Sequence, residues 1–235
     1  RNTSSSPALT ALAASNPNIH ILPGDITSLP QLRAAADSIS KITGGSLDVL
    51  VNNAGYVEDV TGGLLPSSLT DDENLPRVVD SFNKSIETNV LGAIYVTNAL
   101  LRLILKGEQK KIVHTSSGMA DTDLVLKSGL GYAVPYSASK AALNLVVAKF
   151  AAELGPQGVK VVAMSPGWVD TDDEVSPEKE AAVQYMASQF AKVDPRVKGR
   201  IEKEVSIRDQ LETISKLSME LSGSFISQHG NKDWF

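Results

Sequence analysis

Short apolar runs alternate along the chain with longer segments in which apolar residues recur at helical spacing. This alternation is typical of βα units arranged around a parallel sheet. The apolar runs predict strands at residues 19–22, 47–51, 111–114, 159–164 and 224–227. The helical patterns predict helices at about 8–15, 29–43, 76–105, 136–154 and 206–221, and a further helix that begins near Ser176 and Pro177.

Polar side chains gather where the predicted strands end. Such clusters occur at Asp25, at Asn52 and Asn53, at Ser116 and Ser117, and over residues 165–171. Open parallel sheets bind their ligands beyond the carboxyl ends of the strands. The sequence therefore predicts one site that is assembled from four separate segments.

Length and composition narrow the class of protein. A chain of 235 residues with 42% apolar residues and no internal repeat fits a single domain over residues 1–235. Its 22 basic and 27 acidic residues give a net charge of −5, the wrong sign for a protein that binds nucleic acid. The absence of cysteine excludes disulfides, thiolate metal sites and a cysteine nucleophile.

The sequence contains neither a membrane or signal segment nor histidines at the spacing of metal ligands. The sequence has no apolar run of about 20 residues and no signal-peptide pattern, so we expect a cytoplasmic protein without a membrane partner. The histidines His20, His114 and His229 lack ligand-like spacing, and we expect no metal site. The acids over residues 170–174 are interpreted as a solvated loop start, and Trp234 and Phe235 as apolar packing after the last strand.

Tyr136 and Lys140 stand four residues apart on a predicted helix, so both side chains project from the same face. An adjacent ammonium favours the phenolate and lowers a phenol pKa from about 10 toward neutrality, which suits acid–base chemistry. A single pair of this kind also arises by chance. The surrounding sequence decides between the two interpretations.

Five segments together resemble the short-chain dehydrogenase/reductase family. They are YSASKAAL from Tyr136, IVHTSS up to Ser117, MSPGWVDT from Met164, NNAG from Asn52 and NVLG from Asn89. They occur in the family's order, and the resemblance covers essentially the whole chain. It implies an α/β Rossmann-like fold, a doubly wound parallel sheet in three α/β/α layers.

The resemblance implies an oxidoreductase that transfers hydride between NADP(H) and a carbonyl or alcohol substrate. Tyr136 would be the general acid or base, and Lys140 would lower the pKa of Tyr136 and hold the nicotinamide ribose. Ser117 would hydrogen-bond the substrate oxygen, with its neighbour Ser116 as the alternative. Asn89 would support a water in a proton relay, or else be a tolerated polar residue in a helix.

The cofactor contacts are implied in the same way. Asp25 and Ile26 would lie beside the adenine, Asn53 and Ala54 near the adenosine ribose, and Val169 and Thr171 near the nicotinamide carboxamide, whereas Asn52 would brace the sheet. Arg1 would neutralise the 2′-phosphate, which favours NADP over NAD. The alternative interpretation of Arg1 is a solvated terminal charge.

The main departure from the family pattern is the lack of a glycine-rich turn of the type T-G-x-x-x-G-x-G, which holds the pyrophosphate at a helix N-terminus. The N-terminal βα unit that would carry this turn is not in the sequence. Two hypotheses remain open. The chain is a segment of a longer reductase, or it is a truncated, catalytically silent relative that acts as a binding module.

Two segments are expected to set substrate specificity. The interval from Ser117 to Tyr136 is longer than usual for the family and carries apolar side chains for a pocket wall, namely Leu124, Val125, Leu126 and Leu130. Residues 172–204 occupy the place of the substrate lid, with a predicted inner face of Val175, Val183, Tyr185, Met186 and Phe190. Relatives pair through helices that correspond to 89–105 and 136–154, whereas members with large loops can be monomeric, so a homo-oligomer and a monomer both stay open.

Overall fold

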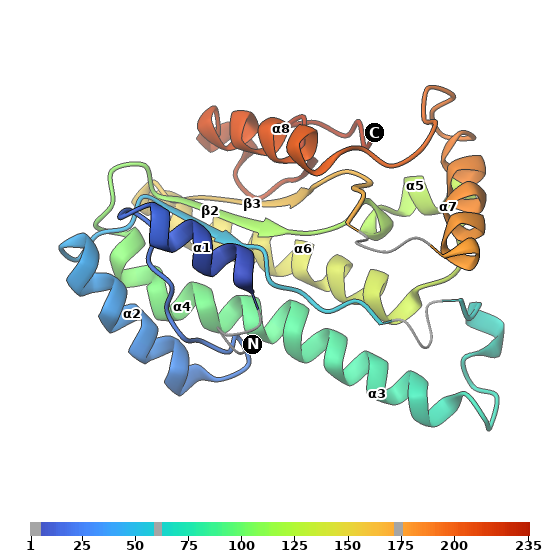
Figure 1. Cartoon of the computed structure of the whole chain (residues 1–235), viewed down its shortest axis with the longest axis horizontal. Helices are drawn as coiled ribbons and strands as arrows, with labels where there is room; N and C mark the ends of the chain where they lie inside the picture. Colours follow the sequence, from blue (N-terminus) through green and yellow to red (C-terminus); the bar gives the residue numbers. More distant parts are fainter. Residues whose placement is uncertain (1–5, 59–62, 172–175) are drawn as a thin grey trace.

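A computed structural model describes residues 6–58, 63–171 and 176–235, and in it a parallel sheet lies between two layers of helices (Figure 1). The strands are β1 (Val49–Asn52), β2 (Lys111–Thr115), β3 (Lys160–Ser165) and β4 (Phe225–Ser227), and they lie side by side in that order. Leu50, Ile112 and Val161 occupy equivalent positions on adjacent strands. The predicted α/β fold with a parallel sheet is confirmed.

Helices cover both faces of this sheet. The helices are α1 (Pro7–Ser15), α2 (Leu29–Thr43), α3 (Leu75–Ile86), α4 (Ala93–Ile104), α5 (Thr122–Ser128), α6 (Val134–Leu154), α7 (Pro177–Phe190) and α8 (Lys203–Ser215). Helices α2, α4 and α6 lie on one side of the sheet and α8 on the other, with α7 beyond the strand ends (Figure 1). Single turns of 3₁₀-helix, η2, η4, η5 and η6, occur at Pro66–Ser68, Gly118–Ala120, Gly155–Gln157 and Met219–Leu221.

The alternation of side chains along each strand produces the three layers. Ile112 and Val161 are fully buried against α4 and α6. The next residues along, Val113 and Val162, are buried instead against Ile214 of α8 and its neighbours. The two central strands, β2 and β3, are therefore apolar on both faces, as a sheet covered by helices on both sides requires.

The predicted strand at 19–22 was wrong. Residues 19–25 are not paired with any strand that the structure describes, and a strand exists only through hydrogen bonds to a neighbour. This segment runs instead as an unpaired connection from α1 to α2.

The helix boundaries agree with the sequence patterns in some places and differ in others. Helix α2 matches its predicted range, and α7 begins where Ser176 accepts a hydrogen bond from the Lys179 amide. The predicted helix 76–105 is interrupted by a π-helical segment, η3 (Glu87–Gly92). Helix α8 begins three residues earlier than predicted and ends at Ser215 rather than 221. The interval after Ser117, expected as a loop, contains η4 and α5.

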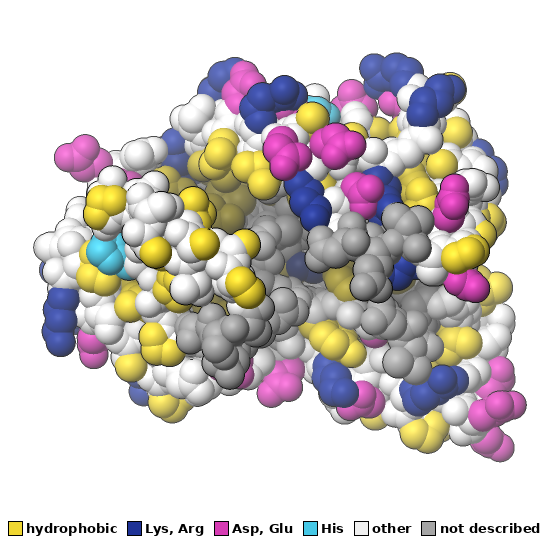
Figure 2. Space-filling view, viewed as in Figure 1, with side chains coloured by type: hydrophobic (Ala, Val, Ile, Leu, Met, Phe, Trp, Pro, Cys, Tyr) yellow, Lys and Arg dark blue, Asp and Glu magenta, His cyan; other side chains and the backbone are white. Residues whose placement is uncertain are grey.

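The surface carries charges of both signs. On the face in Figure 2, basic and acidic side chains are interspersed and do not form a single basic patch. Within the described residues, no helix is long and apolar enough to span a membrane. In the same part of the chain, no group of three or more His, Asp or Glu side chains is arranged to hold a metal ion.

Candidate active site

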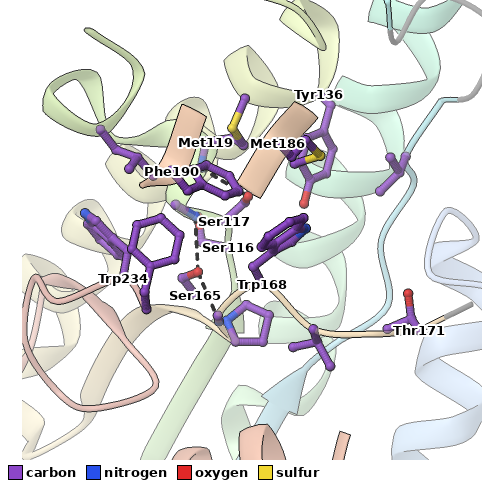
Figure 3. Close-up of a pocket in the computed structure, with 17 residues that line it drawn as sticks. Ser116, Ser117, Met119, Tyr136, Ser165, Trp168, Thr171, Met186, Phe190 and Trp234 are labelled. Atoms are coloured by element: carbon purple, nitrogen blue, oxygen red, sulfur yellow. Dashed lines mark hydrogen bonds between the residues drawn. The ribbon is translucent and has the colours of Figure 1, made fainter. Parts of the chain in front are cut away.

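A cavity of about 290 Å³ opens at the carboxyl ends of β2 and β3. Its wall includes the hydroxyls of Ser117 and Tyr136, the segment 165–169 and Thr171, together with Met186 and Phe190 of α7. Figure 3 shows the Tyr136 hydroxyl pointing into this space. The polar clusters after β2 and after β3 thus meet in one cavity, and the start of α6 joins them there.

The two serines after β2 have different partners. Ser116 is buried, and its hydroxyl donates a 2.6 Å hydrogen bond to Asn144 Oδ1 on α6. Ser117 Oγ accepts a hydrogen bond from the Met119 amide at 3.2 Å, and its hydroxyl also hydrogen-bonds Tyr136. The geometry therefore favours Ser117 over Ser116 as the group that acts beside Tyr136.

Burial raises the pKa of Tyr136 above its usual value of 10, and the hydrogen bond with Ser117 opposes this rise. The prediction that the Tyr136 pKa is lowered is wrong, because the net direction is the opposite. Lys140 Nζ lies 5.8 Å from the centre of the Tyr136 ring. The ammonium thus lies near the ring, but the low polarity of the surroundings dominates the pKa.

Lys140 lies beneath the carboxyl end of β2. Its side chain is almost completely buried, and Nζ donates a 2.7 Å hydrogen bond to the Thr115 carbonyl. Burial lowers the pKa of Lys140 from 10.5 to about 8, because a charged amine is poorly solvated there. Lys140 is therefore still mostly protonated at pH 7, but it loses its proton near pH 8 rather than above pH 10.

This pKa predicts a specific pH dependence of stability. Between pH 8 and 10.5 the unfolded chain binds the Lys140 proton more strongly than the native state, so the free energy of unfolding increases with pH across this window. Relative to the variant Lys140→Met, the wild type is expected to gain about 2–3 kcal/mol between these limits. Urea denaturation of both proteins at a series of pH values measures this difference. A difference that stays constant with pH would contradict the lowered pKa.

Asn89 lies within η3, and both the oxygen and the nitrogen of its side-chain amide form hydrogen bonds. Its Oδ1 accepts from the Tyr56 amide at 2.7 Å, and its Nδ2 donates to the Tyr56 carbonyl and to Ser139 Oγ, each at 2.9 Å. Ser139 in turn donates to the Tyr136 carbonyl at 2.7 Å. Asn89 therefore fixes the chain that follows β1 to the helix turn that carries Tyr136.

Replacing Asn89 by alanine is expected to destabilise the protein by about 1–3 kcal/mol, because the Tyr56 amide and carbonyl lose their partners in a buried place. The same replacement at Asn98, which is exposed on α4, is the matched control and should cost little. Thermal unfolding monitored by circular dichroism compares the two. Equal stabilities of the two variants would show that the Asn89 bonds contribute nothing.

A larger cleft of about 970 Å³ adjoins the cavity, and Thr171 lines both. Its wall contains Asp25, Ile26, Asn53 and Ala54, together with neighbouring residues of the same loops. The Asp25 carboxylate accepts hydrogen bonds from the amide and hydroxyl of Thr27 at 2.9 and 2.8 Å, and these bonds lower its pKa. The cleft thus gathers five of the residues for which the resemblance implied cofactor contacts, namely Asp25, Ile26, Asn53, Ala54 and Thr171.

Not every predicted residue lines these two spaces. Val169 lines the cavity, whereas Asn52 does brace the sheet, with its amide 3.2 Å from both Thr97 Oγ1 and His114 Nδ1. Of the predicted lid face, Met186 and Phe190 line the cavity, while Tyr185 is 52% exposed. Arg1 and Val175 lie outside the described residues.

Several residues of the cavity wall had no individual role in the sequence-based prediction. Ser165 Oγ accepts hydrogen bonds from the amides of Gly118 and Gly167, at 3.1 and 3.4 Å, and joins the ends of β2 and β3. Trp168 lies inside the polar cluster 165–171, and its place in that cluster indicates that it belongs to the site. Trp234 and Phe235, interpreted as apolar packing, also line the cavity, and nothing near them in the sequence indicates this.

The family model and the similar proteins indicate the same family. Residues 2–182 match the family model for short chain dehydrogenases. A short-chain dehydrogenase/reductase from Aspergillus aculeatus is 41% identical over 234 residues, which is 98% of this chain and 86% of the relative.

Two solved structures with the same fold hold nicotinamide cofactors. The NADPH-bound carbonyl reductase from chicken fatty liver has a TM-score of 0.73 and 24% identity, covering 95% of this chain and 80% of that one. The structure of ElxO with NADP bound has a TM-score of 0.70 and 26% identity, covering 97% and 84%. With the family model matching most of its length, the chain belongs to the short-chain dehydrogenase/reductase family.

Proposed function

We propose that this oxidoreductase transfers hydride between NADP(H) and a carbonyl or alcohol substrate, with Tyr136 as the general acid or base. The observation that carries the proposal is the position of the Tyr136 hydroxyl. It lies beside Ser117 on the wall of a mostly apolar cavity, and this cavity adjoins the larger cleft at Thr171. A carbonyl oxygen bound there can meet a proton donor and a hydrogen-bond donor at one point.

The shape of the cleft supports a nicotinamide cofactor. Gly55 lines it, and a Cβ at this position would come 3.2 Å from Asn89 Oδ1 and 3.4 Å from Lys140 Nζ. A glycine therefore leaves room for a ligand next to the Lys140 ammonium. Asp25 and Ile26 would hold the adenine, Asn53 and Ala54 the adenosine ribose, and Val169 and Thr171 the carboxamide. When bound, the cofactor supplies or accepts the hydride.

The protein's own groups handle the proton and the orientation. In the reductive direction, Tyr136 donates its hydroxyl proton to the oxygen of the carbonyl, and Ser117 donates a hydrogen bond to the same oxygen. Lys140 holds the nicotinamide ribose hydroxyls, and its charge stabilises the phenolate that remains. Asn89 supports a water that returns a proton toward Lys140. In the oxidative direction the same groups act in reverse.

Two arguments support NADP rather than NAD. The resemblance implies that Arg1 would neutralise the 2′-phosphate, and two similar solved structures hold NADPH or NADP. The test is the rate of cofactor oxidation with a ketone, measured for NADPH and for NADH at equal concentrations. We expect consumption that depends on the ketone and is faster with NADPH. Absence of consumption with either cofactor would refute the reductase, and a preference for NADH would refute the choice of NADP.

A further inference from the structure

Aromatic side chains are concentrated around the cavity beside Tyr136. The chain has two Trp, five Tyr and five Phe, which is only 5% of its residues. Five of these twelve line this one cavity, namely Tyr136, Trp168, Phe190, Trp234 and Phe235. Both tryptophans of the protein are thus wall residues of the same cavity, although 66 positions separate them in the sequence.

Three of these rings form a continuous wall. The centres of the Trp168 and Phe190 rings are 5.1 Å apart with an angle of 72° between planes, an edge-to-face contact. Phe190 and Phe235 follow at 4.8 Å and 49°. In Figure 3 the Trp168 ring and the Tyr136 hydroxyl both point into the cavity, and Trp234 stands on its far side. A flat ligand that reaches Tyr136 therefore meets the Trp168 ring.

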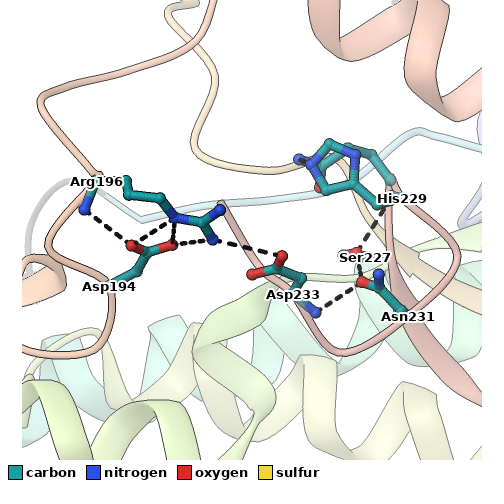
Figure 4. A network of polar contacts seen from close by, with 7 residues as sticks. Asp194, Arg196, Ser227, His229, Asn231 and Asp233 are labelled. Carbon is teal, nitrogen blue, oxygen red and sulfur yellow. Dashed lines mark hydrogen bonds and ion pairs between the residues drawn. The ribbon is translucent and has the colours of Figure 1, made fainter.

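Hydrogen bonds and ion pairs hold the backbone on both sides of the wall. Trp168 is held by its carbonyl, which accepts a 2.8 Å hydrogen bond from the Ile201 amide. The turn that leads to Trp234 is stabilised by the contacts in Figure 4, where Asn231 Oδ1 accepts from the Asp233 amide at 2.8 Å and Arg196 bridges Asp194 and Asp233. Rigid aromatic surfaces bind with little loss of conformational freedom.

The charge and the size of the cavity restrict the ligand further. Among the described residues that line it, none is Asp, Glu, Lys, Arg or His. An ionised ligand group would lose its hydration there without gaining a counter-ion, at a high cost in free energy. The volume of about 290 Å³ lies near the lower end of the range of about 300–1,000 Å³ typical of ligand pockets.

We propose that the substrate is a neutral, compact aromatic carbonyl compound of one or two fused rings, and that Trp168 determines this specificity by contacting the aromatic ring. The carbonyl part of this inference rests on the proposed function. The aromatic ring lies against Trp168 and Phe190, and its carbonyl group points to Tyr136 and Ser117. The selectivity for neutral rings rests on the cavity alone.

The test measures binding by the quenching of tryptophan fluorescence, because both tryptophans line the cavity. The probes are 1-tetralone, a neutral bicyclic aromatic ketone; 1-decalone, its saturated counterpart; and benzoylformate, an aromatic keto acid with a negative charge. We expect 1-tetralone to bind at least about tenfold more tightly than either of the others. Equal affinity for 1-decalone or benzoylformate, or no binding of 1-tetralone, would overturn the proposal.

Variants of Trp168 show whether this side chain causes the selective binding of 1-tetralone. Trp234 still provides the fluorescence signal in these variants. Trp168→Leu should weaken 1-tetralone binding about tenfold and leave 1-decalone binding unchanged, whereas Trp168→Phe should restore most of the affinity. Tyr185→Leu, an aromatic change on α7 outside the cavity wall, is the matched control and should have no effect. Wild-type affinity in Trp168→Leu would overturn the role of Trp168.

The same probes separate this inference from the proposed function. Selective binding of 1-tetralone without any consumption of NADPH would refute the reductase and leave the aromatic site standing. Consumption of NADPH with benzoylformate at the same efficiency as with 1-tetralone would support the reductase and refute the aromatic specificity.

Discussion

Replacing Tyr136 by phenylalanine is expected to lower kcat for ketone reduction by about 10²–10⁴-fold while leaving the affinity for NADPH unchanged. The change removes only the hydroxyl that points into the cavity and keeps the ring that packs in α6. Without that hydroxyl, Ser117 can still hydrogen-bond the substrate oxygen but no adjacent group donates a proton. Steady-state kinetics gives kcat, and a fluorescence titration of NADPH gives the affinity.

Tyr185→Phe is the control for this experiment, since it removes a hydroxyl from an exposed tyrosine outside the cavity wall. It should leave kcat and affinity as in the wild type. Retention of wild-type kcat by Tyr136→Phe would rule out Tyr136 as the proton donor. A loss of NADPH affinity equal to the loss of kcat would indicate a structural role instead.

Replacing Gly107 by alanine is expected to destabilise the fold by about 2–4 kcal/mol. A Cβ at Gly107 would lie 2.1 Å from the Leu47 carbonyl oxygen and 2.7 Å from its carbon, and a backbone contact cannot be relieved by rotating a side chain. Here the end of α4 meets the chain that enters β1, and the Leu47 amide donates to the Leu103 carbonyl at 3.0 Å. To accept the methyl group, α4 would have to move away from the sheet.

Gly199→Ala provides the comparison, because no atom lies within 4 Å of a Cβ built at that position. It should leave the free energy of unfolding unchanged or raise it slightly. Urea denaturation of both variants measures the difference. Equal stability of the two variants would contradict the close contact between the Gly107 and Leu47 backbones.

The elements that could be predicted from the sequence are those with a strong local signal. Helix α2 has apolar residues at helical spacing and ends at Gly44 in a left-handed conformation, and its predicted range is the observed one. The segment 19–22 has an equally apolar composition but no paired neighbour, and pairing is a property of the whole sheet. The π-helical segment at Asn89 likewise depends on hydrogen bonds to Tyr56, which is 33 residues away.

The candidate site likewise contains residues that the sequence predicted and residues that it did not. Ser117, Tyr136 and Lys140 lie in motifs at strand and helix ends, and it was the resemblance of these motifs to a known family that implied one shared site. The aromatic wall was not predictable, because Trp234 and Phe235 reach the cavity only through the fold of the last turn. The direction of the Tyr136 pKa was also missed, since burial depends on the packing around the site.

The most direct test of the reductase is the fate of the hydride. The protein is incubated with 1-tetralone and NADPH deuterated at the transferable C4 position, and the alcohol formed is examined by mass spectrometry. We expect an alcohol with one deuterium on the carbinol carbon for the wild type, and almost none of this product for Tyr136→Phe. An alcohol without deuterium, or equal labelled product from both proteins, would contradict this expectation.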